Sequence, residues 1–324
     1  MKQLVGILFW LNVFAAAAES AKTPAQLIAQ ARDLAGTVGE AVWPGLGEEP
    51  FSVLLVEGDQ ETLFCRDGSA LGFEPGRHDP ATDCQTWTRS RQYPPDWLAS
   101  FPLSDGIPTI VVGTPEQTGR DAMDWVLTLL HEHLHQLQYA MPGYYPGVAA
   151  LDLAGDDQSG MWMLNYPFPY ADPAVAAVVE QLGKAALDTL DAMDSEDRQS
   201  GANALGRYLQ YRSRLQDLVS DADWRYAELQ LWQEGVARWL ELAVARKAAE
   251  GAAGFQPLAT KKLSAIRSEL AALSSSSQGR VIFYPLGAAE AMMLEASTHQ
   301  WPAVYWDQPF QLGGQLQGVL YEDD

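Results

Sequence analysis

A long amphipathic segment that carries three histidines constrains the fold of this chain more than any other feature. The run LTLLHEHLHQLQY holds three of the chain's five histidines. Apolar side chains recur at helical spacing over residues 119–139 and predict one helix. Its apolar face consists of Met123, Val126, Leu127, Leu130, Leu134 and Leu137. We therefore expect a helix that packs on a core and also presents histidine side chains.

The spacing of the histidines indicates a metal site. Residues four apart on an α-helix lie on one face, so His131 and His135 could reach the same ion. Glu132 lies about 100° around the helix, where it could act on a water molecule without being a ligand. His133 lies about 200° from His131 and is expected to be an outer neighbour of the site or a surface residue. This H-E-x-x-H pattern on a helix predicts a zinc site with a carboxylate base.

A catalytic zinc site needs a third protein ligand, and a later helical segment offers two carboxylates. The segment LQLWQEGVARWLELAVAR spans residues 229–246. Glu234 is the candidate ligand, and Glu241, on the same helical face, is its chief rival. An alternative for Glu234 is an exposed glutamate that pairs with Arg238, which lies between the two at helical spacing.

The HExxH segment at 131–135, followed by the run E-G-V-A at 234–237, resembles the glutamate-zincin metallopeptidases. In that clan the third ligand is a glutamate on a second helix. The resemblance implies a zincin-like catalytic part in which His131, His135 and Glu234 hold Zn²⁺ and Glu132 is the general base. It covers two short segments and assigns no specific family. In the best-known families the glutamate lies much closer to the second histidine in sequence, whereas here 98 residues intervene.

A peptidase also needs a hydrogen-bond donor for the developing oxyanion. The resemblance points to a tyrosine or histidine on a later segment, and Tyr284, in the run FYPLGAAEAMMLE, is the candidate. Tyr284 could equally be a core or capping residue. The weaker candidates are Arg280, His299, Tyr166 and Tyr170.

Two further segments could contact a substrate. The resemblance implies that the strand expected at 107–114, IPTIVVGT, is an edge strand that pairs with an extended peptide. It could equally be a buried strand. The aromatic-rich loop expected at 142–172 is long enough to have a binding role, although its rings could instead pack on the helices.

The hydrophobic pattern predicts a predominantly helical α+β fold. A small mixed part that contains β-strands is expected to about residue 115, and a mostly α-helical, zincin-like part from about 119. The expected strands are FSVLLVEG, ETLFC and IPTIVVGT, and the Gly- and Pro-rich stretch 72–95 is expected to be loop. The C-terminal run GQLQGVLYE could form another strand. The further helices are expected at 24–42, 173–193, 203–219, 222–249, 260–273 and up to about 298.

The N-terminal residues have the pattern of a secretory signal peptide. Lys2 precedes an apolar run and four alanines, so residues 1–18 are expected to be removed, leaving one domain over 19–324. An uncleaved anchor is the alternative, but the run is short for a bilayer. We expect a periplasmic or extracellular protein of a bacterium. In such an oxidising compartment Cys65 and Cys84 would form a disulfide rather than two free thiols.

The charge and the motifs together limit the function. A formal net charge of -21 argues against binding nucleic acid. The sequence lacks the G-x-S-x-G motif, so a serine hydrolase is not indicated. We expect an exported zinc hydrolase whose substrate is a peptide or protein. The alternatives are a non-catalytic zinc-binding protein that retains the fold, and a zinc hydrolase of non-peptide substrates.

Overall fold

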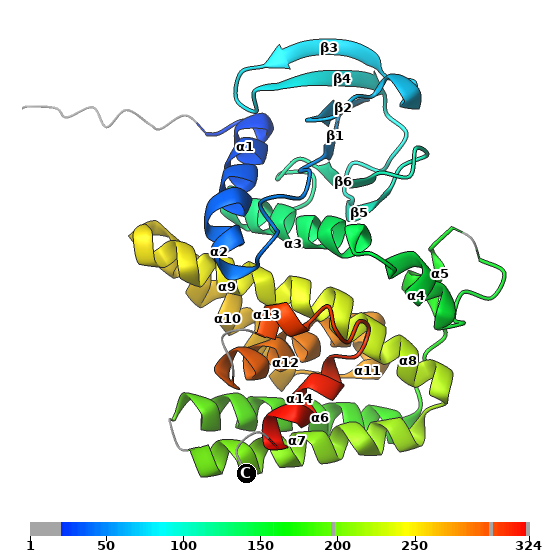
Figure 1. Ribbon diagram of the computed structural model, residues 1–324, viewed down its shortest axis with the longest axis vertical. Coiled ribbons are helices and arrows are strands. Elements are labelled where there is room, and N and C mark those ends of the chain that lie inside the picture. The colour runs from blue at the N-terminus through cyan, green and yellow to red at the C-terminus, as the bar shows by residue number, and fades with distance from the viewer. Residues whose placement is uncertain (1–20, 158, 196–197, 298–300, 322–324) are drawn as a thin grey trace, which may run out of the picture.

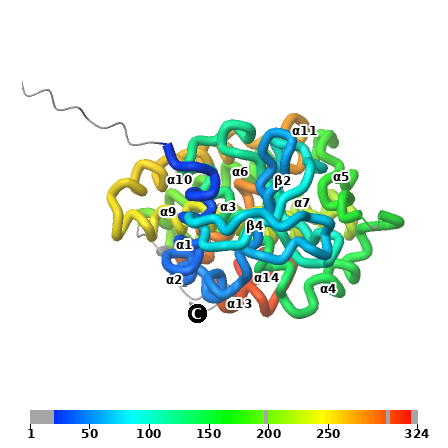
Figure 2. The backbone as a smooth tube through the Cα atoms, turned by 90° about the horizontal axis from the view of Figure 1, so that it is seen from above, coloured from blue at the N-terminus to red at the C-terminus, as the bar shows by residue number. Residues whose placement is uncertain are grey.

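The computed structural model describes residues 21–157, 159–195, 198–297 and 301–321. The expected signal peptide and His299 lie outside these residues. A β-sheet forms one end of the molecule, and the helices form layers below it (Figure 1). Seen from above, strands β2 and β4 cross over the helical part (Figure 2).

The N-terminal part builds a mixed six-stranded sheet with the strand order β3-β4-β2-β1-β6-β5. Strands β1 and β6 are parallel, and every other neighbouring pair is antiparallel. The strands are β1 (Val53–Glu57), β2 (Gln60–Phe64), β3 (Glu74–Asp79), β4 (Cys84–Ser90), β5 (Leu98–Pro102) and β6 (Pro108–Gly113).

The central strand β1 is buried on both faces, which explains its continuous apolar run. Successive side chains of a strand point to opposite faces. Val53 and Leu55 face the main core, which extends through the helices. Leu54 and Val56 face a smaller apolar cluster on the other side of the sheet. The sheet is therefore fixed between two apolar layers.

Helices make up about 61% of the chain, so the expected mixed and predominantly helical fold is confirmed in this coarse form. Its zincin-like character stays a prediction. The α-helices are α1 (Pro24–Leu34), α2 (Glu40–Val42), α3 (Ala122–Ala140), α4 (Tyr144–Ala150), α5 (Trp162–Asn165), α6 (Pro173–Asp194), α7 (Arg198–Leu218), α8 (Asp221–Gln230), α9 (Val236–Gly251), α10 (Gln256–Ala271), α11 (Ser275–Gln278), α12 (Phe283–Ser297), α13 (Trp301–Val304) and α14 (Leu312–Tyr321). Short π or 3₁₀ turns are η1 (Ala35–Gly39), η2 (Ser69–Leu71), η3 (Leu231–Gly235), η4 (Ala253–Phe255) and η5 (Gly279–Ile282).

Two expectations about secondary structure are wrong, and for the strand at 107–114 the structure decides between two alternatives. The stretch 72–95 contains β3 and β4, whose side chains are mostly not buried and so lack an apolar alternation. The C-terminal run is helical over its described residues, which lie in α14, where Leu312 and Leu316 are buried one turn apart. The strand at 107–114 is not an edge strand, because β6 lies between β1 and β5. The edge strands of this sheet are β3 and β5.

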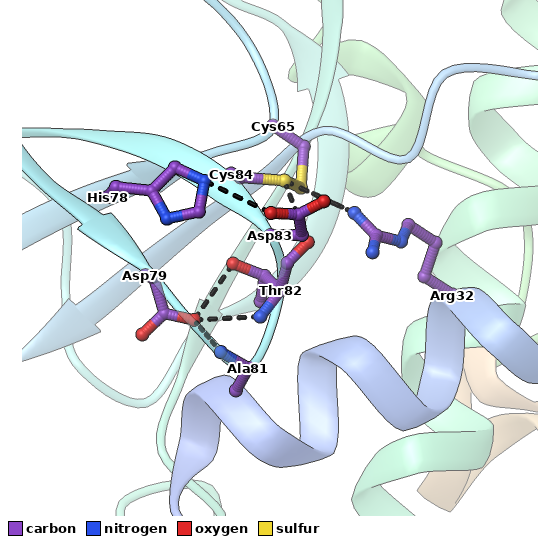
Figure 3. Close-up of a disulfide and its surroundings, with 8 residues drawn as sticks. All are labelled: Arg32, Cys65, His78, Asp79, Ala81, Thr82, Asp83 and Cys84. Carbon is purple, nitrogen blue, oxygen red and sulfur yellow. Dashed lines mark hydrogen bonds and ion pairs between the residues drawn. A yellow bond between two sulfur atoms is a disulfide. The ribbon is translucent and has the colours of Figure 1, made fainter.

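The expected disulfide is present between Cys65, just after β2, and Cys84, at the start of β4 (Figure 3). Arg32 of α1 donates to both sulfur atoms at 3.2 Å. The cross-link therefore ties the end of β2 to the neighbouring strand β4, and Arg32 connects it to the first helix. His78 pairs with Asp83 at 3.1 Å, and both side chains are exposed.

None of the helices in the described part of the chain is long and apolar enough to cross a membrane.

A buried ionic network joins the helices that lead to the candidate site. Tyr208 of α7 donates to Glu290 of α12 at 2.5 Å. Arg212 of α7 donates to Glu290 at 3.1 Å and to Glu228 of α8 at 2.7 Å. The buried guanidinium of Arg212 therefore forms ion pairs with two buried carboxylates. Burial raises the pKa of Glu290 to about 7, with the Glu228 charge adding to the rise and Arg212 opposing it.

This network predicts a pH dependence of stability. The pKa of Glu290 is higher in the folded protein than its ordinary 4.5, so the folded state binds the proton more tightly. Its stabilising contribution is complete below about pH 4.5 and is lost as the pH rises to about 7. Between pH 5 and pH 8 the wild type should lose up to about 3 kcal/mol of unfolding free energy through Glu290. The Glu290→Gln variant cannot titrate at this position and should not show this loss. Denaturant unfolding at both pH values measures this, and parallel pH profiles would contradict it.

Candidate metal centre

Helix α3 presents His131 and His135 on one face, as the sequence predicts. The side chain of Asp121 accepts from the first-turn backbone and caps the helix. Gln136 Nε2 donates to the backbone oxygens of Ser52 and Pro108, which fixes the helix against the sheet. The two imidazole rings are buried, with centroids 4.9 Å apart and nearly perpendicular planes. The helix therefore holds both rings in one place beneath the sheet.

Glu234 reaches the two histidines from the π-turn η3, which separates α8 from α9. Its Oε2 lies 3.6 Å from His131 Nε2 and 3.5 Å from His135 Nε2. Single π-turns inside α-helices occur often at functional sites, because the extra residue redirects side chains. The ligand atoms of the three residues all lie within 4.8 Å of one another, so this group could hold a metal ion.

Two glycines bring η3 and α12 into backbone contact and so place Tyr284 at the site. A Cβ atom added to Gly235 would collide with the Cα of Gly287. One added to Gly287 would collide with the carbonyl oxygen of Leu231. Tyr284 lies three residues before Gly287, and its ring is parallel to that of His131 with centroids 6.2 Å apart. The glycine of the E-G-x-A run is therefore needed here for a close helix crossing.

We expect Gly287→Ala to lower the free energy of unfolding by separating α12 from η3 beside the site. The new methyl group would force α12 away from η3, at a cost of about 1–3 kcal/mol in unfolding free energy. Gly206 of α7 is a matched control, since a Cβ there meets nothing within 4 Å. Gly206→Ala should stabilise by up to about 1 kcal/mol. Thermal and denaturant unfolding compare the two variants, and equal effects would contradict the role of the crossing.

The other ring nitrogen of each histidine has its own buried partner. His131 Nδ1 donates to Glu241 Oε1 at 3.0 Å, and His135 Nδ1 donates to Gln138 Oε1 at 2.7 Å. The amide of Gln138 donates to Tyr305 Oη at 2.6 Å, which explains why its oxygen faces the histidine. A hydrogen bond at one ring nitrogen sets the tautomer at the other. The Nδ1 contacts therefore leave Nε2 as the ring nitrogen that faces Glu234 in both histidines.

Glu241 contacts the Nδ1 atom of His131, whereas Glu234 faces the Nε2 atoms of both histidines. Its carboxylate also accepts from Arg238 at 3.2 Å and from Lys262 of α10. Burial alone would raise the pKa of Glu241, but Lys262, Arg238 and His131 hold it well below the ordinary value. The alternative pairing of Glu234 with Arg238 is not found, since Arg238 pairs with Glu241 and Glu269.

Glu132 is buried beside the histidines, and burial raises its pKa. Burial acts to lower the pKa of His131, but hydrogen bonds to Glu234 and Glu241 raise it to about 10. Burial acts to raise the pKa of Glu234, but His135, His131 and Arg280 hold it well below 4.5. Glu234 therefore stays ionised, which is the form that a metal ligand requires.

Among the candidate oxyanion donors, Tyr284 and Arg280 lie next to the group formed by His131, His135 and Glu234. Burial, followed by the charge of Glu234, raises the pKa of Tyr284 well above 10, so its hydroxyl keeps its proton. Arg280 donates to Glu234 Oε1 at 3.2 Å. The rings of Tyr166 and Tyr170 instead pack on Tyr226 and on Phe168.

Of the two alternatives for His133, the surface position is excluded, because its side chain is buried. Its Nε2 donates to the Leu46 carbonyl at 2.8 Å, and its Nδ1 lies 2.8 Å from Gln136 Oε1. Sequence reasoning also missed Gln138 as the partner of His135. The three-residue helical spacing of that pair was an available signal, because residues three apart are neighbours on a helix.

No family model, curated protein or solved structure matches this chain.

Proposed function

We propose that this protein is an exported zinc-dependent hydrolase that cleaves peptide bonds. The observation that supports it most is that two imidazole Nε2 atoms and one carboxylate oxygen converge beside the buried carboxyl group of Glu132. A purely structural zinc site does not need that fourth group. The resemblance to glutamate zincins supports the same function.

The donor set fits zinc. Two imidazole nitrogens and one carboxylate are a ligand set of catalytic zinc sites, which leave one position open. Two donors with bonds of 2.0–2.1 Å in a tetrahedral arrangement would lie about 3.3 Å apart. Glu234 Oε2 lies 3.5 Å and 3.6 Å from the two Nε2 atoms, which is close to that value. The distances from Glu234 to both histidines therefore fit a shared ion, which His131, His135 and Glu234 would hold.

The residues of the chain would divide the reaction between them. Bound zinc would supply Lewis acidity, which lowers the pKa of a water molecule and polarises the scissile carbonyl. Glu132 would take the proton of the attacking water and pass it to the leaving amine. Tyr284, whose hydroxyl stays protonated, would donate a hydrogen bond to the developing oxyanion. Glu241 and Gln138 would keep the imidazoles in orientation.

Export is supported by the disulfide between Cys65 and Cys84, because such bonds persist in oxidising compartments. The N-terminal signal-peptide pattern supports the same location.

The first test is metal content together with hydrolysis. Purified protein should hold close to one zinc per chain by elemental analysis. It should cleave members of a quenched fluorescent peptide library, lose activity with a chelator and regain it with zinc. A protein that takes up no zinc after reconstitution would overturn the proposal.

A further inference from the structure

The two oxygens of the Glu234 carboxylate have different surroundings. Oε2 faces the histidine Nε2 atoms at 3.5 Å and 3.6 Å. Oε1 instead accepts a hydrogen bond from Arg280 Nη1 at 3.2 Å. A carboxylate can bind a metal through one oxygen or through both. The contact with Arg280 therefore engages the oxygen that a second bond to an ion would need, and that second bond would have to compete with this hydrogen bond.

Arg280 is itself held from two sides. Its Nη1 also donates to Gln230 Oε1 at 3.2 Å, and its guanidinium lies over the ring of Tyr284, 5.2 Å from the centroid. Gln230 in turn donates to the Met163 carbonyl at 3.4 Å. The Arg280 side chain is 22% exposed. Planar guanidinium groups lose little freedom in such fixed contacts, so this residue could hold a carboxylate in one orientation.

We propose that Arg280 is a positioning residue that keeps Glu234 a one-oxygen ligand. This inference rests on the metal centre proposed above. A catalytic zinc needs an open position in addition to its three protein ligands. If Oε1 were released, Glu234 could turn and offer both oxygens, and the second oxygen would take the position that the reacting water and the scissile carbonyl need. Arg280 acts through Glu234 and needs no contact with the substrate.

Cobalt substitution tests the coordination directly. Cobalt(II) replaces zinc in such sites, and its visible absorption weakens when a four-coordinate ion becomes five-coordinate. Arg280→Gln removes the charge, and Arg280→Lys keeps the charge but removes the planar fork. The matched control is Arg246→Gln, because Arg246 of α9 forms a half-exposed pair with Glu295 at 3.5 Å. Circular dichroism and melting of each variant would verify the fold.

We expect both Arg280 variants to retain about one cobalt per chain and to show weaker visible absorption than wild type. The kcat for peptide cleavage should fall roughly 10–100-fold in the zinc-loaded variants, while KM stays close to wild type. Arg246→Gln should match wild type in both measurements. A wild-type spectrum in Arg280→Lys would overturn the inference, because the charge alone would then suffice. Unchanged spectra in both variants would also overturn it. Only a wild-type protein that takes up no metal would overturn the proposed function as well.

Discussion

Replacing Glu132 with glutamine should abolish hydrolysis and leave the metal in place. The amide has nearly the same shape as the carboxyl group but cannot accept the proton of the attacking water. General-base catalysis contributes typically about 10²–10⁴-fold, so kcat should fall by that factor. The ligand atoms of His131, His135 and Glu234 are untouched, so the metal content should stay at the wild-type level. Peptide cleavage and elemental analysis of the same preparations measure both quantities.

The control for this variant is a glutamate outside the site. Glu250 lies at the end of α9 and forms an exposed pair with Lys247, so Glu250→Gln should retain full activity. Two results would contradict the role of Glu132. Activity within a few-fold of wild type would show that another group takes the proton. Loss of the metal would show that Glu132 is itself needed to hold it.

The sequence predicted those parts of the site that depend on local helix geometry. The spacing of His131 and His135, with Glu132 between them, requires only a regular helix, and α3 is regular over these residues. The disulfide was predictable because only two cysteines exist and the chain has the pattern of an exported protein. The central strand β1 was predictable from its apolar run.

The relation between Glu234 and Glu241 could not be predicted, because it depends on tertiary structure. On a regular helix both residues would lie on one face, which made them rival ligands on the sequence alone. The π-turn before α9 and the crossing of Gly235 with Gly287 give them different roles. Strands β3 and β4 were missed for a related reason. They are held by backbone pairing and the disulfide, and not by an apolar alternation.

The zinc affinities of Glu234→Ala and Glu241→Gln should show that Glu234 is a metal ligand and that Glu241 is a partner of a ligand. Apparent binding free energies of structural zinc are about 10–16 kcal/mol, so one of four coordination positions accounts for about 2.5–4 kcal/mol. Glu234→Ala should therefore weaken zinc binding roughly 10²–10³-fold and lose the ion on dialysis. Glu241→Gln keeps a hydrogen-bond acceptor for His131 and should weaken binding by about tenfold, at the low end of the range for such partners. Competition with a chromophoric chelator measures both affinities.

The order of these two losses decides which carboxylate binds the ion. Glu269→Gln is a suitable control, because Glu269 pairs with Arg238 outside the site, and it should leave zinc affinity unchanged. If Glu241→Gln lost more affinity than Glu234→Ala, then Glu241 would be the ligand, and His131 would have to turn its Nδ1 toward the ion. That rotation would break the hydrogen bond of 3.0 Å between His131 and Glu241. It would also turn His131 Nε2 away from the Glu234 carboxylate, whose Oε2 lies 3.6 Å from it. The observed packing favours the opposite order.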